Sequence, residues 1–564
     1  MHLVPYKELY EVSMDRYVVP PITIIAVAAA AVFYGLYAFA QTSSKIISFV
    51  FITAFLLLCA LAVFLIAVSV AGKLLPQGRE GRRSSRKKPA LSAIRFILFA
   101  AAGAAIGSYS VHTLQREQRP PQTLASLPTV RTLIAELTGE PVPAGSDYYR
   151  IPVKLIACGA GRNEQFSASG TVQLFVPAAL VRGTYSGGIT RIGRAEQSEA
   201  AAPLLHRTAA FAKALQMQQE CRFYVRGMRL AVQGKFGKTG TVFYARPVQP
   251  VFLGWNSPLS RLRTFFRFAF MRMLYSWGDA GGLLLALLAA DKAFLPAECI
   301  AAFRNAGLAH ILALSGMHLS LIGTAALQGG RLFGHKSRAV WFSLAAVFLF
   351  VWFAGSAPSL NRALGMVCIT AAGRALGLKP PPLSVLCAML TVHIAIAGAE
   401  AITLGFMLSY GACAGIIIFG DACAHLLRGK IPPAFASSIS ASVGAQLFTA
   451  PIVISAIGNI AAAGVIASCA VSPLVSVFLI AGLICIPLAL IFPFTSPLLG
   501  YGLNAAYRII FASADFFARL PVIAPESGMQ RVLFSAAAFA VGGCCVVLAY
   551  VQRKRTAAAF PRLT

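Results

Sequence analysis

The stretch that decides the fold is Ile460 to Phe492, IAAAGVIASCAVSPLVSVFLIAGLICIPLALIF, which contains no charged side chain. A helix needs about 20 apolar residues to cross a bilayer core of about 30 Å. Because this stretch is longer than one span and contains Pro473, it predicts a hairpin of two helices. Similar apolar runs occupy Ile22 to Ala40, Ile46 to Ala71 and Val532 to Val551.

The composition of the whole chain agrees with these runs. Hydrophobic residues make up 57% of the 564 residues, charged residues make up 12%, and the mean hydropathy is +0.72. An average soluble domain is about 45–50% apolar and about 25% charged. The sequence therefore predicts a polytopic α-helical membrane protein with about twelve transmembrane helices. Acidic residues precede the first run, so we expect a retained anchor and not a cleaved signal peptide.

The distribution of basic residues predicts the orientation. Residues 73–95 hold eight basic residues and one acidic residue, and short loops this basic stay in the cytoplasm. Residues 111–255 should then lie outside the cytoplasm. We expect four parts: N-terminal transmembrane helices (1–110), an extracytoplasmic β domain (111–255), a transmembrane channel domain (256–552) and a basic cytoplasmic tail (553–564).

The segment 111–255 differs from its flanks. Short alternating pieces such as Tyr149 to Leu155, Thr171 to Val176, Arg222 to Arg226 and Thr241 to Tyr244 are separated by glycine-rich turns. This spacing predicts a small β-barrel or sandwich. The segment has 17 basic and 8 acidic residues, a net charge of +9.

Two further features of this region have alternative interpretations. Cys158 and Cys221 are the only two of the twelve cysteines in the segment, and they either form a disulfide or stay reduced. The stretch from Pro258 to Trp277 mixes four arginines with aromatic residues. It is either an amphipathic helix in the membrane interface or a plain membrane anchor.

Polar residues interrupt the apolar sequence FRNAGLAHILALSGMHL at 303–319. We expect one helix here, with His310 and His318 on the same face, two turns apart. Polar side chains within a bilayer are costly, and they usually face a pathway or a partner helix.

The segment at 303–319 resembles the central motif of the ComEC competence proteins, the DNA-uptake channels of natural transformation. Four further stretches resemble that family's elements in the same order: Leu287 to Leu295, Gly355 to Ala363, Gly405 to Tyr410, and Ala445 to Pro451 followed by Gly458-Asn459. The resemblance implies an OB-like outer domain. Many members also carry a C-terminal metallo-β-lactamase-like domain, and we expect a form that lacks it.

The polar residues of these motifs are the predicted pore or DNA path. In the predicted orientation most of them fall at the outer ends of their helices, although some of them, such as Ser315, would equally serve helix packing. The set is His310, Ser315, His318, Ser359, Asn361, Arg362, Phe406, Ser409, Gln446 and Asn459.

A second set of residues, in the outer domain, combines positive charge with aromatic rings. Single-stranded DNA needs basic groups for its phosphates and aromatic rings for its bases. We expect contacts from Arg222, Phe223, Tyr224, Arg226, Arg229, Lys235, Phe236 and Lys238. A solvated face or contact with lipid headgroups is the alternative for any one of them.

The predicted function is therefore a channel for single-stranded DNA in the cytoplasmic membrane, with no catalytic residue, metal or cofactor. A DNA receptor, a nuclease and a cytoplasmic ATPase would act in trans, since no GxxxxGK[ST] loop is visible. One alternative is a proton-coupled small-molecule transporter, although Glu400 and Asp421 are the only acids between His310 and Gly500. An intramembrane serine protease that pairs Ser315 with His393 is a further alternative.

Overall fold

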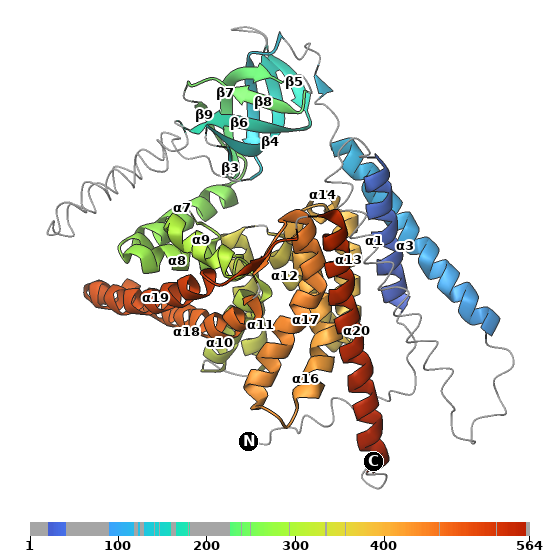
Figure 1. The fold of residues 1–564 in the computed structure, drawn as a ribbon. Helices are drawn as coiled ribbons and strands as arrows, with labels where there is room; N and C mark the ends of the chain where they lie inside the picture. The colour runs from blue at the N-terminus through green and yellow to red at the C-terminus, as the bar shows by residue number, and fades with distance from the viewer. Residues whose placement is uncertain are drawn as a thin grey trace. The chain divides into compact units, whose positions relative to one another are not determined.

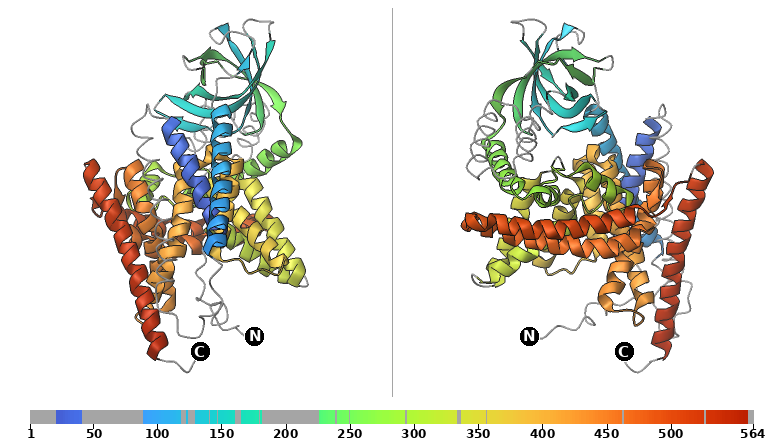
Figure 2. Two further views of the ribbon diagram at one scale, coloured as in Figure 1. Left: turned by 90° about the vertical axis from the view of Figure 1, so that its right-hand side faces the viewer. Right: turned by 60° about the vertical axis from the view of Figure 1, so that its left-hand side comes forward.

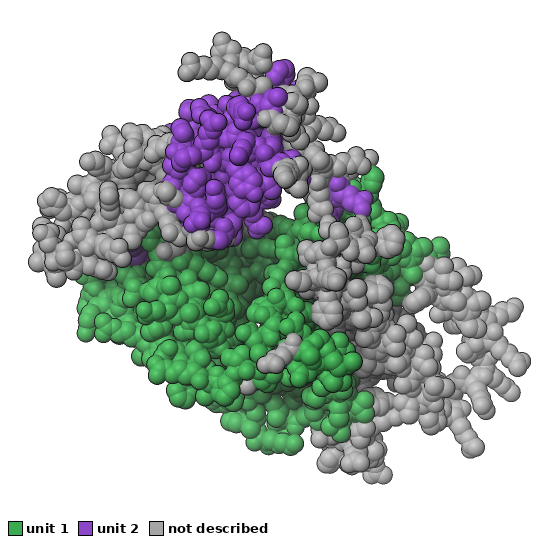
Figure 3. Space-filling view, turned by 45° about the horizontal axis from the view of Figure 1, so that its top comes forward, with its two compact units in different colours: residues 1–112, 277–564 green, residues 113–276 purple. Residues whose placement is uncertain are grey.

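The computed structural model describes residues 21–40, 89–117 and 122–123, and residues 129–180 and 226–559 with short internal gaps. Two compact units make up the chain (Figure 3). Unit 1 comprises Met1–His112 and Trp277–Thr564, and unit 2 comprises Thr113–Ser276. Unit 2 thus extends beyond residue 255 and takes in the helix α7 (Pro258–Tyr275).

Unit 2 is built around a closed β-barrel of five strands (Figure 1). The strands are β2 (Thr132–Leu137), β4 (Tyr148–Gly159), β6 (Thr171–Pro177), β7 (Met228–Phe236) and β8 (Val242–Ala245). β4 pairs with β2 and β6, and β7 pairs with β2 and β8, all antiparallel. A parallel pairing of β6 with β8 closes the ring. The prediction of a small β-barrel is confirmed.

The alternation of side chains explains why these strands form a barrel. Along β6 and β7 every second residue is buried, and the inward positions carry residues such as Leu174, Val176, Leu230 and Val232. Period-2 alternation directs one set of side chains to the core and the other outward. Cys158 is one of the buried core residues, at 1% exposed, whereas Cys221 lies outside the described residues. The disulfide therefore stays a prediction.

Short strands extend the barrel sheet. β1 (Gln122–Thr123) pairs with β5 (Gln165–Ser169), which pairs with β4, and β3 (Val142–Ala144) also pairs with β4. β9 (Val251–Trp255) pairs with β7 and leads into α7. The helix predicted at 258–277 is present as α7, and its exposed face carries Leu259, Leu262, Phe265 and Phe266, 46 to 63% exposed. An exposed apolar helix face suits the membrane interface, which stays a prediction.

Unit 1 is helical. After α1 (Pro21–Ala40) and α3 (Pro89–Glu117), its elements follow in chain order: α8 (Gly278–Ala289), α9 (Ala297–Asn305), α10 (Gly316–Leu332), α11 (Lys336–Ala354), α12 (Pro358–Ala375), α13 (Pro382–Ile396), α14 (Gly398–Ala401), α15 (Leu404–Gly415), the π-helix η2 (Ile416–Gly420), α16 (Asp421–Leu427), α17 (Pro433–Ala456), β10 (Ile460–Ala461), α18 (Gly464–Ile491), the 3₁₀-helix η3 (Pro493–Thr495), α19 (Ser496–Ala518), β11 (Val522–Ile523) and α20 (Gly528–Ala559).

Four helical stretches of the described residues are long and apolar enough to cross a membrane: Leu404–Leu427, Phe435–Ala456, Gly464–Ile491 and Gly528–Ala549. Shorter apolar helices cover Ile22–Tyr37, Gly278–Ala289, Arg338–Ala354 and Pro382–Ile396. The chain is a membrane protein, and the total of twelve crossings stays a prediction. The apolar run Ile46 to Ala71 lies outside the described residues.

The predicted hairpin at Ile460 to Phe492 is wrong, because α18 is one continuous helix of 28 residues that contains both Pro473 and Pro487. Prolines are tolerated in membrane helices, where neighbouring groups satisfy the backbone carbonyls that they leave free. The hairpin was also predicted because the run is longer than one span, but a long apolar helix can cross a bilayer at a tilt. Figures 1 and 2 show α18 and α19 side by side, running across the direction of α17 and α20.

The single helix expected at 303–319 is also wrong. α9 ends at Asn305, α10 begins at Gly316, and the residues between them are not helical. Gly307 adopts a φ of +76°, and a Cβ there would lie 3.1 Å from Cβ of Ala461. Glycine in this left-handed conformation is a common helix terminator. His310 and His318 therefore do not share a helix face.

Candidate functional site

Polar side chains from five helices meet at one end of the unit 1 bundle. We call this group the helix-end cluster. Its members lie at or near the start of α10 and α12, at the end of α13, in α14 and in the middle of α15: Ser315, His318, Ser359, Asn361, Arg362, His393, Glu400, Ser409 and Tyr410.

The start of α12 supplies three of these side chains, Ser359, Asn361 and Arg362. Pro358 opens the helix, where a fixed φ and a missing N–H are favourable. The hydroxyl of Ser359 donates to the carbonyl of Leu314, just before α10. One turn of α12 is thereby joined to the start of α10.

Arg362 connects α12 with α15. Its Nε donates to Oγ of Ser409 at 2.9 Å, and its guanidinium carbon lies 5.8 Å from the ring centre of Tyr410. Its position also borders α10, because a Cβ added to Gly316 would lie 3.9 Å from Arg362 Nη2. The N-terminal ends of α10 and α12, which carry partial positive charge, thus lie beside a guanidinium that also contacts the middle of α15. This end of the bundle should attract anions.

His393 and Glu400 form the centre of the cluster. Nε2 of His393 lies 2.9 Å from Oε2 of Glu400, and Nδ1 lies 3.1 Å from the hydroxyl of Tyr410. The His393 side chain is 4% exposed and that of Glu400 is 30% exposed. Asn361 Nδ2 donates to the same carboxylate, with distances of 3.4 and 3.3 Å to its two oxygens. A continuous chain of polar contacts therefore runs from a partly exposed carboxylate to a buried phenol.

His318 is held by Ser315, the residue that directly precedes its own helix. The backbone N–H of Ser315 donates to Nδ1 of His318 at 3.2 Å, and Oγ of Ser315 lies 3.0 Å from the same nitrogen. Since Nδ1 accepts, a neutral His318 carries its proton on Nε2. That nitrogen is fully buried and has no hydrogen-bond partner among the described residues.

Four of the predicted pore residues are not members of the cluster, and three of these lie away from it. His310 is exposed, with Nδ1 3.2 Å from the carbonyl of Gly307. Gln446 on α17 lies against the start of α18, where its Nε2 is 3.0 Å from the place that a Cβ of Gly464 would occupy. Asn459 is exposed after the end of α17. Phe406 is near the cluster, since its ring centre lies 5.0 Å from that of His393.

Sequence reasoning missed the partnership of His393, Glu400 and Tyr410. One signal was present, because Glu400 is one of only two acids between His310 and Gly500. A lone intramembrane acid usually has a named partner, and His393 is the nearest histidine along the chain.

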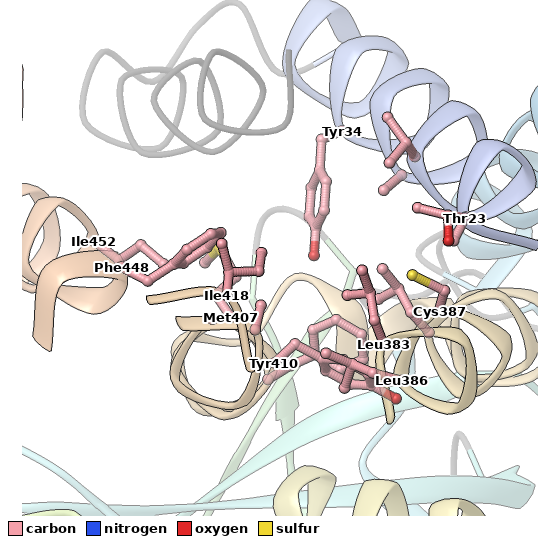
Figure 4. Close-up of a pocket in the computed structure, with 17 residues that line it drawn as sticks. Thr23, Tyr34, Leu383, Leu386, Cys387, Met407, Tyr410, Ile418, Phe448 and Ile452 are labelled. Carbon is pink, nitrogen blue, oxygen red and sulfur yellow. The ribbon is translucent and has the colours of Figure 1, made fainter. Parts of the chain in front are cut away.

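A cavity of about 100 Å³ adjoins the cluster (Figure 4). Tyr34 on α1 and Tyr410 on α15 line it together with mainly aliphatic residues of α13, η2 and α17. The hydroxyl of Tyr34 donates to the carbonyl of Ala401 at 2.9 Å, which ties α1 to α14. The cavity is almost wholly apolar, so it offers no polar path by itself.

The arrangement does not support the pairing of Ser315 with His393. Both ring nitrogens of His393 are engaged, one by Glu400 and the other by Tyr410. A serine nucleophile needs its base within hydrogen-bond reach. No group of three or more metal-ligating side chains occurs among the described residues.

Four of the eight predicted DNA-binding residues in unit 2 are described. Arg229 and Lys235 point outward from β7, and Arg226 is exposed in the turn before it. Nε of Arg229 lies 3.9 Å from a carboxylate oxygen of Glu136. Phe236 is partly buried against the ring of Phe243 in the barrel core. Arg222, Phe223, Tyr224 and Lys238 lie outside the described residues.

Residues 287–554 match a family model described as Competence protein. The match begins in α8, ends in α20 and contains the whole helix-end cluster. No curated protein and no solved structure matches the chain.

Proposed function

This chain belongs to the competence protein family, and on that premise we propose that it is the channel through which single-stranded DNA crosses the cytoplasmic membrane during natural transformation. The family domain indicates a role in DNA uptake by competent cells. Our proposal goes beyond this role by specifying that the DNA is single-stranded, that it crosses the cytoplasmic membrane, and which residues it contacts.

The observation that carries this proposal is the position of Arg362. This half-buried guanidinium lies beside the N-termini of α10 and α12, in a unit whose apolar helices can cross a membrane. A DNA strand carries one negative charge per nucleotide, so its path requires positive potential. Conduction also requires contacts weak enough for the ligand to leave. A single arginine beside neutral polar groups meets both requirements.

Unit 2 supports the same proposal. Numbered in chain order, its barrel strands are β2 (first), β4 (second), β6 (third), β7 (fourth) and β8 (fifth). Around the ring they follow the order first, second, third, fifth, fourth. We take this as an OB-like barrel, a fold that commonly binds oligonucleotides. The net charge of +9 over residues 111–255 suits a polyanion.

The test is genetic and follows labelled DNA. The gene is deleted in its host, and the strain is complemented with wild type, Arg362→Ala or Arg519→Ala. Arg519 is the matched control, because it is exposed and paired with Asp515. We expect deletion and Arg362→Ala to leave DNA bound outside while import falls by about 100-fold or more, the scale of losing a charged contact of about 3 kcal/mol. Normal import in the deletion strain would contradict the proposal.

One observation favours the second candidate, a proton-coupled small-molecule transporter. The contact between His393 and Glu400 joins two titratable groups within a membrane domain, and such pairs serve as proton relays in transporters. If the deletion strain imports DNA normally, proton flux should be measured in proteoliposomes of wild type and Glu400→Gln.

The channel proposal further requires a DNA receptor, a nuclease and a cytoplasmic ATPase in trans.

A further inference from the structure

Four outward-facing side chains form one row across the barrel of unit 2. Arg150 on β4 is opposite Phe175 on β6, and Phe175 is opposite Tyr244 on β8. Tyr244 is in turn opposite Lys235 on β7. Since neighbouring strands lie about 4.8 Å apart, the row is about 14 Å long. Two aromatic rings thus lie between two cations, and we call this set the aromatic row.

A third ring adjoins the row. The ring centre of Tyr148 on β4 lies 6.4 Å from that of Phe175 and 6.2 Å from that of Tyr244, and the latter two are 5.4 Å apart. Gly237 lies close to this group, because a Cβ there would be 3.3 Å from Cε2 of Tyr244. Three rings are therefore held together on the outer surface of the barrel.

These rings do not contribute to the barrel core. Tyr148 is 38% exposed and Tyr244 is 40% exposed, and both occupy outward positions of strands whose inward positions are buried. Cross-strand aromatic pairs add only about 0.2–1 kcal/mol each to a sheet, so the stability of the barrel depends mainly on its inward residues. A cluster of exposed rings on a charged surface indicates a binding surface.

The charged side chains that point outward from these four strands are mostly basic, although the exposed Asp147 directly precedes Tyr148 in the chain. The outward residues of β4, β6, β7 and β8 include no aspartate or glutamate. They do include the cations Arg150, Lys154 and Lys235, whereas a fourth cation, Arg229, lies at the other end of β7 and pairs with Glu136. Rings combined with cations and without acids are what a sequence-tolerant single-strand site requires, because bases stack while phosphates pair with positive charge.

We propose that the aromatic row is the surface on which this barrel holds single-stranded DNA. This inference rests on the proposed function and adds to it the site in unit 2. Bases stack on Tyr244, Phe175 and Tyr148, and phosphates pair with Arg150 and Lys235. β4 and β6 are the second and third barrel strands, which is the face by which OB folds bind oligonucleotides.

The test measures binding of a fluorescent 20-nucleotide oligothymidine to the full chain in phosphatidylcholine nanodiscs. We expect Tyr244→Ala to weaken binding by about 10- to 100-fold, the effect of losing one stacked base. Tyr244→Phe should stay within about twofold of wild type, because the ring is kept. The tyrosine points outward, so both variants should fold, and an unchanged melting temperature checks this. No weakening in Tyr244→Ala would overturn the proposal.

The charge contribution is tested by salt dependence. Lys235→Ala should reduce the slope of log affinity against log salt by about 0.7, the value for one phosphate of a single strand. Arg229→Ala is the matched control. It removes the same charge at the other end of β7, about 20 Å along the strand, where Arg229 pairs with Glu136. Equal effects of the two substitutions would show general attraction to the barrel and would overturn the row as the site.

The proposed channel function and the proposed binding site can each be contradicted without the other. If Tyr244→Ala binds the oligonucleotide normally while gene deletion abolishes import, the aromatic row is wrong and the channel remains. If Tyr244→Ala loses binding while the deletion strain imports DNA normally, the row is supported as a single-strand site. The channel is then contradicted.

Discussion

At the scale of single residues, the helix-end cluster shows how few polar groups this membrane domain uses. Arg362, Ser359 and Asn361 all belong to one helical turn, and each contacts a different helix or loop. Arginine suits this position because its planar group donates from Nε and lies over a ring at the same time. Lysine could not provide both contacts.

Glu400→Gln tests the central contact of the cluster. The substitution keeps the shape of the side chain but removes the charge that faces His393 and Asn361. We expect the free energy of unfolding in detergent to fall by about 1–3 kcal/mol, because buried partners lose a charged hydrogen bond.

Asp515→Asn is the control for Glu400→Gln. It removes a carboxylate from the exposed pair with Arg519 and should change stability by less than about 1 kcal/mol. Equal unfolding curves for Glu400→Gln and wild type would mean that the contact with His393 adds nothing to stability.

The sequence predicted part of the cluster. It placed Ser359, Arg362 and Phe406 at helix ends, where the structure has them, because helix starts carry local signals such as Pro358. It could not bring His393 to Glu400 and Tyr410, because that contact depends on how α13, α14 and α15 turn and pack. Nor could it show that α9 ends before His310, since the close approach of Gly307 to Ala461 is a long-range contact.

At the scale of elements, small residues let the helices of unit 1 approach closely. A Cβ on Gly444 of α17 would lie 2.7 Å from the backbone N of Gly420 and 2.8 Å from the carbonyl oxygen of Gly415. Small residues at such crossings are typical of membrane helix pairs. The π-helix η2 begins at this crossing, and its Ile418 lines the cavity in Figure 4. π-Helical turns are frequent at functional sites.

Gly444→Ala should therefore destabilise unit 1. The added methyl group cannot fit without moving one backbone, so we expect a loss of about 1–3 kcal/mol in unfolding free energy.

Gly543→Ala in α20 is the matched control, since nothing lies within 4 Å of its Cβ position. Alanine favours a helix over glycine, so that variant should be neutral or slightly more stable. Thermal unfolding of both proteins in one detergent gives the comparison. A stable Gly444→Ala protein would show that α15 and α17 can separate freely.

At the scale of the whole molecule, the proposed function assigns DNA binding to unit 2 and DNA passage to unit 1. The family match, residues 287–554, lies within unit 1, whereas the aromatic row lies in unit 2. The barrel was predictable because strand alternation is a local pattern. The proposed binding face was not predictable, because Phe175 and Tyr244 become neighbours only through the parallel pairing of β6 and β8.

Arg362→Ala should separate the two activities. Its affinity for the oligothymidine probe should stay within about twofold of wild type, because the aromatic row is unchanged and stacking accounts for the sequence-tolerant binding. Import of labelled DNA by the same variant should fail. A tenfold weaker affinity would mean that unit 1 contributes directly to the binding measured, and the two activities would then not be separable.

The parallel pairing of β6 with β8 has a further consequence for biogenesis. Its partners, such as Gln173 and Val242, are roughly 70 residues apart in the chain, and closing so long a loop carries an entropic cost. Contacts between distant segments slow folding, and synthesis delivers β8 last. The barrel therefore cannot close until the ribosome has passed residue 245. Until then the outer edge of β6 is unpaired, and a nascent chain stalled before β8 would expose it to aggregation.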